Sequence, residues 1–495
     1  MEATVSDSTV VPTAHDDVIS WDYQADVVIA GYGVAGASAA VEAARAGADV
    51  LVLERSGGWG GAAAMAGGFI YLGGGTALQR ACGFEDTVDN MKTFMKAAFG
   101  PGTDDEKIDA YCEGSVAHYD WLVEAGVPFR EAFYGEPGWE PRGDEGLMYS
   151  GGENAAPFKD LVAPAPRGHL PQMENKKTGE RGGGYMLMKP LVETAESLGV
   201  RAEYDIRVES LVVDGDGRVT GIIAKRYGSR LAVRARRGVV LAMGSFAFDE
   251  EMVREHVPHL LGRPGSAIEA HDGRAIRMCQ ALGAATTHMN AAEVALHVDM
   301  QLVARGILVN SSGQRFATED TYGGILGQEV LFRQGNSAFL VMDENGYESA
   351  VATRSVMARP QPTWVSESHA ELENSMGLPP YALTTTIDFY NRHALTGSDP
   401  AFGKKPEWVR PLEGPLAVFD LRNSTSGFPL GGVKTTVDSE VLHVSGEPIA
   451  GLFAAGRCTS GICSGGYASG ASLGDGSFFG RRAGISAAAN ETPAV

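Results

Sequence analysis

Near its N-terminus the chain carries residues whose types and spacing suit the binding of a dinucleotide. Gly31, Gly33 and Gly36 form a Gly-x-Gly-x-x-Gly pattern directly after an apolar run, and Glu54 closes the next apolar run. The first glycine permits a tight turn, the second lets backbone N–H groups approach a pyrophosphate, and the third lets a helix lie close to a sheet. A helix N-terminus attracts phosphate, and Glu54 can accept hydrogen bonds from ribose hydroxyls. The pattern therefore predicts a dinucleotide site.

The hydrophobic pattern around these residues predicts the elements that must position them. It indicates a strand over 26–30, a helix over 35–46 and a second strand over 49–54. Ala40 and Ala44 are one helical turn apart and keep one side of this helix small. The segment is predicted to form a βαβ unit with the glycine turn between its first strand and its helix.

A second passage rich in glycine and alanine, residues 56–79, follows Glu54 and includes Gly67 and Gly68. The fingerprint alone does not separate FAD from NAD, but a second such passage lets backbone amides wrap a longer cofactor. A flexible linker is the alternative, although linkers are polar and this passage contains Met65, Phe69, Ile70 and Tyr71. The chain has no second fingerprint for a nicotinamide nucleotide. We therefore expect FAD as the only redox group and an external electron acceptor.

The remaining pattern predicts how the chain is divided. Residues 84–125 read as helical, 204–226 as two strands around a DGDG turn, and 236–248 as a buried strand that runs into a glycine turn. The composition becomes poorer in glycine after about residue 289, and a strand pattern that ends in a glycine turn at Gly456 resumes at 415. We therefore expect a flexible tail over 1–22, an FAD-binding domain over 23–288 and 415–491, and a catalytic lid domain over 289–414.

Composition excludes several classes of partner and location. The 495 residues contain 62 acidic and 41 basic side chains, and the resulting net charge of -21 opposes binding to nucleic acids and anionic membranes. Five cysteines, an odd number, do not form a disulfide framework and indicate a reducing compartment. No secretory signal or membrane-spanning run is present in the sequence. We expect a cytoplasmic protein without a metal site.

Two pairs of charged residues have structural as well as chemical interpretations. His271 and Asp272 could form an acid/base pair, but an aspartate before the predicted helix 274–282 is more typical of a helix cap beside a cofactor wall. Arg315 and Glu319 are interpreted as a structural ion pair rather than as catalytic groups.

The motifs resemble those of the FAD-dependent fumarate reductase and 3-ketosteroid dehydrogenase group of flavoproteins. The resemblance spans residues 26–484 and is carried by GYGVAG with Glu54, LAMGSF, HDGRAI, GQRFATED, NRHALTGSDPAFGK, GGVKTTVD and IAGLFAAG. It implies an α/β fold in which a Rossmann-like FAD-binding domain of the glutathione-reductase type is split by an inserted α+β catalytic lid domain. It also implies non-covalent FAD and a substrate between flavin and lid. The implied FAD contacts are Ala35, Gly36, Glu54, Arg55, Gly61, Ala62, Ala63, Val208, Gly244, Arg457, Ser472 and Leu473.

The tail of the chain distinguishes the branches of this group. Residues 464–474 contain neither the His nor the Arg with which fumarate-type reductases clamp a dicarboxylate. The 1-ene-forming dehydrogenases typically carry Tyr-Pro-Gly-Pro-Gly, of which Tyr467 matches the tyrosine while Ala468 and Ser469 do not match. The remaining Tyr-x-Ser is similar to the 3-ketosteroid Δ4-(5α)-dehydrogenase branch. That resemblance implies that Tyr467 binds the 3-oxo group, that Ser469 is the base, and that Tyr322 assists it.

The implied reaction suits these residue types. Desaturation between carbons 4 and 5 removes a proton from carbon 4, which the neighbouring ketone acidifies, and a hydride from carbon 5. A tyrosine hydroxyl aimed at the ketone stabilises the developing enolate, whereas serine acts as a base only with a relay and without competing water. The resemblance thus implies an FAD-dependent 3-oxo-5α-steroid 4-dehydrogenase, an oxidoreductase of steroid metabolism that acts on CH–CH groups.

Other functions stay open from the sequence alone. The alternatives within enzymes are a 3-ketosteroid 1-dehydrogenase and a fumarate-reductase-like flavin enoate reductase. A further alternative is a flavoprotein that transfers electrons for a partner subunit, although no cluster-binding set of cysteines is present. Tyr467 and Ser469 could also fill space in a flavin loop without a chemical role.

Overall fold

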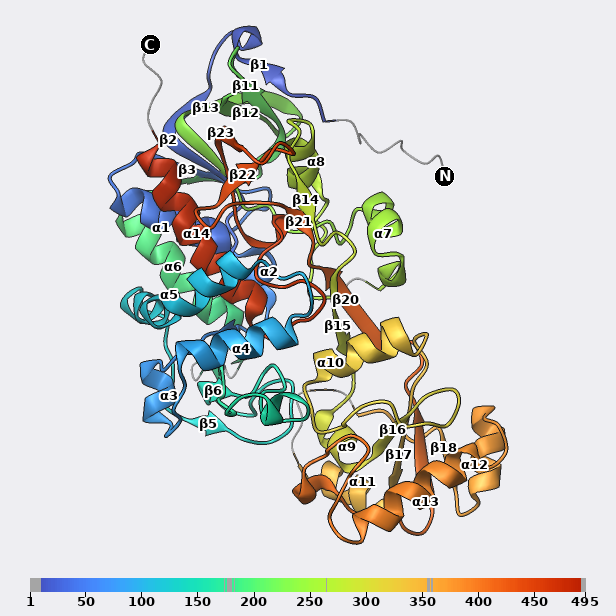
Figure 1. The fold of residues 1–495 in the computed structure, drawn as a ribbon. Coiled ribbons are helices and arrows are strands. Elements are labelled where there is room, and N and C mark those ends of the chain that lie inside the picture. The colour runs from blue at the N-terminus through green and yellow to red at the C-terminus, as the bar shows by residue number, and fades with distance from the viewer. Residues whose placement is uncertain are drawn as a thin grey trace.

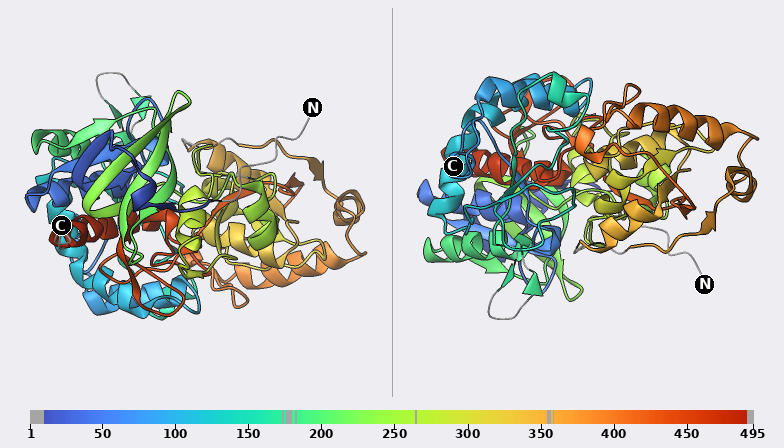
Figure 2. Two further views of the ribbon diagram at one scale, coloured as in Figure 1. Left: turned by 90° about the horizontal axis from the view of Figure 1, so that it is seen from above. Right: turned by 90° about the horizontal axis from the view of Figure 1, so that it is seen from below.

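The chain folds into two bodies that lie side by side (Figures 1 and 2). The structure is a computed structural model, and it describes residues 10–172, 174–175, 180–181, 183–263, 265–353, 357 and 359–490. The larger body contains both ends of the described chain, and the smaller body is formed by a stretch between them. This arrangement confirms the predicted α/β fold with an inserted second unit.

A nine-stranded sheet forms the centre of the larger body. Its middle is parallel, because β13 pairs in parallel with both β2 and β23, β2 with β3, and β3 with β10. An antiparallel ribbon of β11, β12 and β13 extends one side. The strands are β1 (Thr13–Ala14), β2 (Tyr23–Ala30), β3 (Val50–Leu53), β10 (Arg201–Glu203), β11 (Arg207–Val213), β12 (Val219–Arg226), β13 (Ser229–Leu241), β22 (Glu440–Leu442) and β23 (Pro448–Ala454).

Helices cover one face of this sheet, and the predicted βαβ unit lies at its centre. The helix α1 (Val34–Arg45) follows β2 and packs against the last helix, α14 (Ala471–Ala489). Their contact is close because Gly480 and Gly484 of α14 lie against the backbone of Ala35 and Ala39 of α1. The other helices on this side are α4 (Val88–Ala98), α5 (Asp105–Glu124) and α6 (Gly183–Ser197). Small residues thus allow two helices from opposite ends of the chain to pack closely against each other.

The smaller body has its own antiparallel sheet of four strands. A two-stranded ribbon, β15 with β20, connects it to the larger body. The elements are β15 (Ala292–Leu296), β16 (Ile307–Val309), β17 (Phe339–Asp343), β18 (Trp364–Ser366), β19 (Leu416–Asp420), β20 (Thr425–Pro429), α9 (Met300–Arg305), α10 (Gly323–Gln328), the π-helix η4 (Glu329–Arg333), α11 (Glu344–Val351), α12 (His369–Met376) and α13 (Ala382–Ala394).

A buried ion network holds the smaller body together. Arg315 lies 2.7 Å from Glu319 and 2.9 Å from Asp399, and Lys404 lies 3.4 Å from the same glutamate. All four side chains are at most 4% exposed. The interpretation of Arg315 and Glu319 as a structural ion pair is therefore confirmed, and the pair anchors the turn that leads to the predicted catalytic residue Tyr322.

Shorter elements complete the fold. A four-stranded sheet of two-residue strands lies under α4, and three of its strands come from the segment 129–183. These elements are α2 (Gly61–Met65), β4 (Ile70–Tyr71), α3 (Ala77–Ala81), β5 (Phe133–Tyr134), β6 (Leu147–Met148), β7 (Gly168–His169), β8 (Glu174–Asn175), β9 (Glu180–Arg181), α7 (Glu250–His256), α8 (Arg274–Gln280), β14 (Thr286–Thr287), β21 (Gly432–Val433), and the 3-10 turns η1 (His15–Asp17), η2 (Phe158–Asp160), η3 (Pro258–Leu260), η5 (Pro406–Trp408) and η6 (Gly456–Cys458). Within the described ranges no helix is long and apolar enough to span a membrane.

Two details of the predicted division differ from the structure. Residues 13–22 are not a free tail, because β1 pairs with β11 and Trp21 packs on the sheet next to Gly221. The strand after residue 415, β19, belongs to the sheet of the smaller body, and the chain returns to the large sheet only at β22. Alternation of apolar residues predicts a strand but not the sheet it joins. The boundaries over 23–288, 289–414 and 415–491 otherwise remain a proposal.

The contact between α1 and α14 generates a prediction about stability. A Cβ on Gly484 would lie 2.9 Å from the Cα of Ala39, so Gly484→Val forces two backbones apart, and overpacking costs about 1–3 kcal/mol. We expect a clearly lower Tm for this variant. The neighbouring side chain of Ile485 is 46% exposed, so Ile485→Val is the matched control and should leave Tm within about one degree. Equal Tm values for both variants would contradict this description of the contact.

Candidate active site

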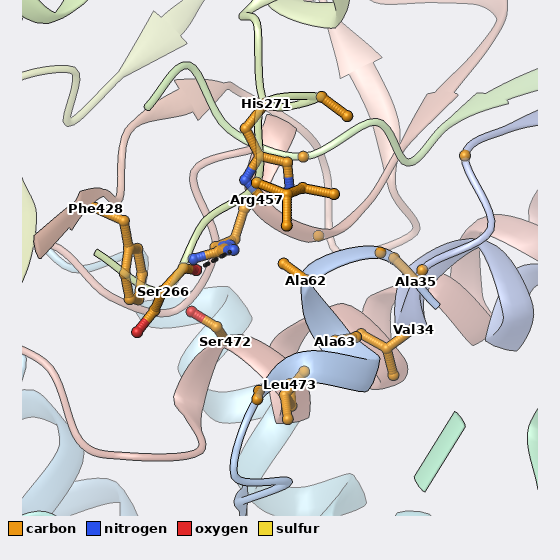
Figure 3. Close-up of a pocket in the computed structure, with 18 of the residues that line it drawn as sticks. Val34, Ala35, Ala62, Ala63, Ser266, His271, Phe428, Arg457, Ser472 and Leu473 are labelled. Atoms are coloured by element: carbon orange, nitrogen blue, oxygen red, sulfur yellow. Dashed lines mark hydrogen bonds between the residues drawn. The ribbon is translucent and has the colours of Figure 1, made fainter. Parts of the chain in front are cut away.

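A cavity of about 370 Å³ lies between the two bodies. Its lining includes all three predicted catalytic residues, Tyr322, Tyr467 and Ser469. Every predicted cofactor-binding residue except Gly36 also lines it: Gly31, Gly33, Ala35, Glu54, Arg55, Gly61, Ala62, Ala63, Gly67, Gly68, Val208, Gly244, Asp272, Gly456, Arg457, Ser472 and Leu473. Figure 3 shows that α1, α2 and the start of α14 contribute small side chains around one space.

The glycine turn between β2 and α1 forms one end of this cavity. Gly31 has a φ of +99°, and a Cβ there would overlap the carbonyl oxygen of Ala242 on the next strand. Gly36 does not line the cavity but lies against the carbonyl of Gly31, where it brings the helix close to the turn. No side chain caps α1 at Gly33, so its first N–H groups are available to a phosphate, as the sequence predicted.

Glu54 lies at the end of β3 beside this turn and is 7% exposed. Its two carboxylate oxygens accept hydrogen bonds from the backbone N–H groups of Tyr32 and Ser56, each at 2.8 Å. The carboxylate thus holds the turn as well as lining the cavity. Each oxygen has a second lone pair that can accept from a ribose hydroxyl, so the predicted ribose contact remains a proposal.

Asp272 and Arg55 form an ion pair in the wall of the cavity. One Asp272 oxygen accepts from Arg55 Nη1 at 2.9 Å and from Arg207 at 3.3 Å, and the other accepts from the N–H of Arg274 at 3.2 Å. The cap position of α8 is Gly273, which has no side chain, so the helix-capping interpretation of Asp272 is wrong by one position: Asp272 holds the start of the helix from the residue before the cap. His271 is not among the partners of the Asp272 carboxylate. Its Nδ1 atom lies 3.3 Å from the Ser245 hydroxyl oxygen, and burial lowers the pKa of the imidazole to about 3. It is neutral at ordinary pH.

Tyr467 is held by the first turn of α14. The N–H of Ser472 donates to the Tyr467 hydroxyl oxygen at 3.2 Å, and Phe428 packs edge-on against the ring at 5.7 Å. Burial raises the pKa of the hydroxyl, and the bonds from Ser472 oppose that rise. A hydroxyl that accepts one hydrogen bond can still donate its own hydrogen, and the helix N-terminus favours negative charge at this place.

Ser469 is fixed through its backbone. Its N–H donates to the carbonyl of Ser150 at 2.8 Å, and the Ser150 hydroxyl donates to the Ser469 carbonyl at 2.9 Å. Glu153 in turn accepts from the N–H groups of Ser150 and Gly151 at 3.2 and 2.8 Å and from the Tyr71 hydroxyl at 3.0 Å. These residues form a clamp that leaves the Ser469 side chain free to line the cavity.

Tyr322 reaches the same place from the smaller body. It precedes α10, and its ring packs against Trp139 at 5.5 Å. Burial raises the pKa of its hydroxyl well above the usual range, the charges of Glu293 and Tyr467 add to the rise, and a side-chain hydrogen bond with Ser469 opposes it. The structure therefore brings together the three predicted catalytic residues, including the one that had to reach across from the lid.

Several residues of the site were missed by the sequence reasoning. Ser150, Glu153 and Trp139 lie in the segment 129–183, where no periodicity or motif marks them. Glu293 and Phe428 line the cavity from paired strands of the connecting ribbon. Their pairing joins distant segments, so only an isolated acidic residue in an apolar strand could have drawn attention to Glu293.

Comparison with known proteins identifies the family of this chain. The model of the FAD binding domain matches residues 26–473. The chain belongs to this family. A 3-oxo-5-alpha-steroid 4-dehydrogenase of Comamonas testosteroni is 28% identical over 89% of this chain and 94% of that protein.

Solved structures are also similar to this flavoprotein. One is a 3-ketosteroid-delta4-(5alpha)-dehydrogenase from Rhodococcus jostii RHA1 in complex with 4-androstene-3,17-dione. It is 66% identical, has a TM-score of 0.95, and the match covers 97% of this chain and all of that one. A 3-ketosteroid delta1-dehydrogenase from Sterolibacterium denitrificans shares the fold, with 20% identity, a TM-score of 0.73 and coverage of 94% and 99%.

FAD is the cofactor of this family, and the residues of the cavity fit it. Two helix N-termini without side-chain caps, those of α1 and α14, border the cavity. Small residues of α2, Ala62 and Ala63, leave room between them. In the part of the chain that the structure describes, no group of His, Cys, Asp and Glu is placed to hold a metal ion.

The clamp on Ser469 generates a prediction about catalysis. Ser150→Ala removes the hydroxyl that donates to the Ser469 carbonyl but keeps the carbonyl that accepts from its N–H. Loss of one such bond is worth about 1 kcal/mol, and small misplacements of a catalytic group are costly. We expect kcat to fall about tenfold with unchanged KM and flavin spectrum.

The control for this variant is Ser115→Ala. Ser115 is a fully buried serine whose hydroxyl accepts from the N–H of Gly73, and it does not line the cavity. It should retain kcat. Equal losses of kcat in both variants would mean that Ser150 acts only through stability.

Proposed function

We propose that this flavoprotein desaturates 3-keto-(5α)-steroids between carbons 4 and 5. The observation that carries the proposal is the convergence of Tyr467, Ser469 and Tyr322 on one cavity that the FAD-binding residues also line. The relatives from Comamonas testosteroni and Rhodococcus jostii support it, since both are described as dehydrogenases of this type and the second holds a 3-ketosteroid.

In the proposed reaction Tyr467 binds and polarises the 3-oxo group. Its hydroxyl oxygen accepts from the Ser472 N–H at 3.2 Å, which turns its hydrogen away from the helix and makes it a stronger donor. When carbon 4 loses its proton, negative charge develops on the ketone oxygen. The donor and the N-terminus of α14 stabilise that charge more than the neutral ketone, and such stabilisation lowers the barrier.

Ser469 takes the proton from carbon 4. A neutral serine is a weak base, so its own proton must leave as the new one arrives, and its hydrogen bond with Tyr322 provides the route. The apolar rings of Trp139 and Phe428 line the cavity and limit the access of water. When FAD is bound it supplies the two-electron acceptor for the hydride that leaves carbon 5.

The alternatives receive less support from the same residues. Ala468 is fully buried and Ser469 is clamped at the positions where the 1-ene-forming branch has Pro and Gly. The loop 464–470 has no cationic side chain to clamp a dicarboxylate. We therefore favour the 4-dehydrogenase over the 1-dehydrogenase and the enoate reductase.

Three further features belong to the proposal. We propose that FAD is held without a covalent bond, and that its electrons pass to an external acceptor. We also propose a cytoplasmic location, which the five cysteines support because none of them is in a disulfide.

An anaerobic reduction of the bound flavin tests the proposed function. A saturated 3-oxo-5α-steroid should bleach the flavin absorbance, and Tyr467→Phe should retain FAD but bleach about 10²–10³ times more slowly. Photoreduced protein should not be reoxidised by fumarate. No bleaching by the steroid, or rapid reoxidation by fumarate, would contradict the function.

A further inference from the structure

A buried carboxyl group in the cavity has no role in the reaction as described so far. Glu293 lies on β15, is 5% exposed and lines the cavity together with Ala295 and His297. Glu293 and Ala295 alternate along β15, so their side chains lie on one face, and His297 is the first residue after the strand ends. His297 is exposed and also borders a second, surface pocket with Arg263 and Asn423. This segment therefore leads from the cavity to the surface.

The neighbours of Glu293 are the catalytic residues themselves. Its cross-strand partner is Phe428 of β20, whose ring contacts Arg457 at 4.3 Å and Tyr467 at 5.7 Å. Residues directly opposite in an antiparallel pair share a face, so Glu293 lies beside this group. Tyr322 belongs to the same group of residues, because the charge of Glu293 raises the pKa of both Tyr322 and Tyr467.

The charged and titratable groups around Glu293 can be named element by element. Arg457 comes from η6, Tyr467 from the loop before α14, Tyr322 from the turn before α10, and His297 from the position directly after β15. The packed helix α10 has no charged side chain, and the residue opposite on β20 is Phe428. Arg457 is the cation that favours the ionised carboxylate.

The proposed proton relay needs a proton acceptor at its end. Ser469 and Tyr322 are both neutral hydroxyls, and each can pass a proton on only if another group accepts one. Glu293 is a carboxyl group that lines the same cavity as Tyr322, and its charge acts on the Tyr322 hydroxyl. His297, which borders both this cavity and the surface pocket, connects it to solvent.

On the basis of the proposed function, we propose that Glu293 is the final acceptor of the proton that leaves carbon 4 of the steroid. The C4–H bond breaks and its proton binds to Ser469 Oγ, while the Ser469 proton moves to Tyr322 Oη and the Tyr322 proton moves through the cavity to the Glu293 carboxylate. The electron pair of the C4–H bond forms the C4=C5 bond as carbon 5 loses its hydride, for which bound FAD would be the acceptor. Glu293 then releases the proton to solvent past His297.

This role has a consequence for pH, because only the ionised carboxylate can accept. Burial raises the pKa of Glu293 to about 8, and the charge of Arg457 limits the rise. The acceptor therefore becomes available as pH rises towards 8. We expect kcat/KM to increase about tenfold per pH unit below that value and to level off above it.

The experiment compares pH profiles of holoenzyme variants with a saturated 3-oxo-5α-steroid. Glu293→Gln should lose the rise of kcat/KM centred near pH 8, with kcat at high pH reduced about 10²-fold, while the flavin spectrum and the spectral shift on steroid binding stay unchanged. Glu293→Asp should keep a pH-dependent profile at a lower rate. The matched control is Glu329→Gln, because burial also raises the pKa of Glu329, which lies on η4 outside the cavity.

The outcomes separate this inference from the proposed function. If wild-type protein reduces its flavin with the steroid but Glu293→Gln keeps the wild-type pH profile, Glu293 is not the acceptor. A loss of flavin or of steroid binding in both Glu293 variants would also overturn the role, because it would show a structural one. If the wild-type protein does not react with the steroid at all, the proposed function fails instead.

Discussion

The close packing of α14 on α1 is the constraint on which the site depends. Gly480 and Gly484 lie against the backbone of Ala35 and Ala39, so the first and last regular helices of the larger body touch over several turns. Both helices begin at the same cavity without a side-chain cap. One N-terminus suits the phosphates of FAD, and the other holds Tyr467. This single helix contact therefore fixes the cofactor site relative to the residue proposed to stabilise the enolate.

Ser469, the proposed base, is held in place by hydrogen bonds of its backbone. The clamp on Ser469 consists of the Ser469 backbone with the carbonyl and hydroxyl of Ser150, so it does not use the Ser469 side chain. The buried Glu153 holds Ser150 in turn by accepting from the N–H groups of Ser150 and Gly151. The smaller body contributes Tyr322 through a turn anchored by the buried Arg315 network. The site is thus assembled from both bodies, and movement between them would separate Tyr322 from Ser469.

The sequence predicted those parts of the molecule that have local signatures. The βαβ unit, the strand-turn-strand around DGDG and the Tyr-x-Ser of the tail each consist of neighbouring residues with a recognisable pattern. It did not predict that β1 would pair with β11, that β19 would join the smaller sheet, or that Ser150 would clamp Ser469. Those contacts join distant segments and depend on tertiary packing, which periodicity does not encode. Glu293 was missed for the same reason.

The central claim is that Tyr467 and Ser469 direct proton loss to carbon 4 and hydride loss to carbon 5. The most direct measurement is the structure of the product formed from a 3-oxo-5α-steroid deuterated at carbon 5. The arrangement of the site predicts a 4-ene that has lost the deuterium. A 1-ene that retains the deuterium at carbon 5 would contradict it and would place the base on the other side of the ketone.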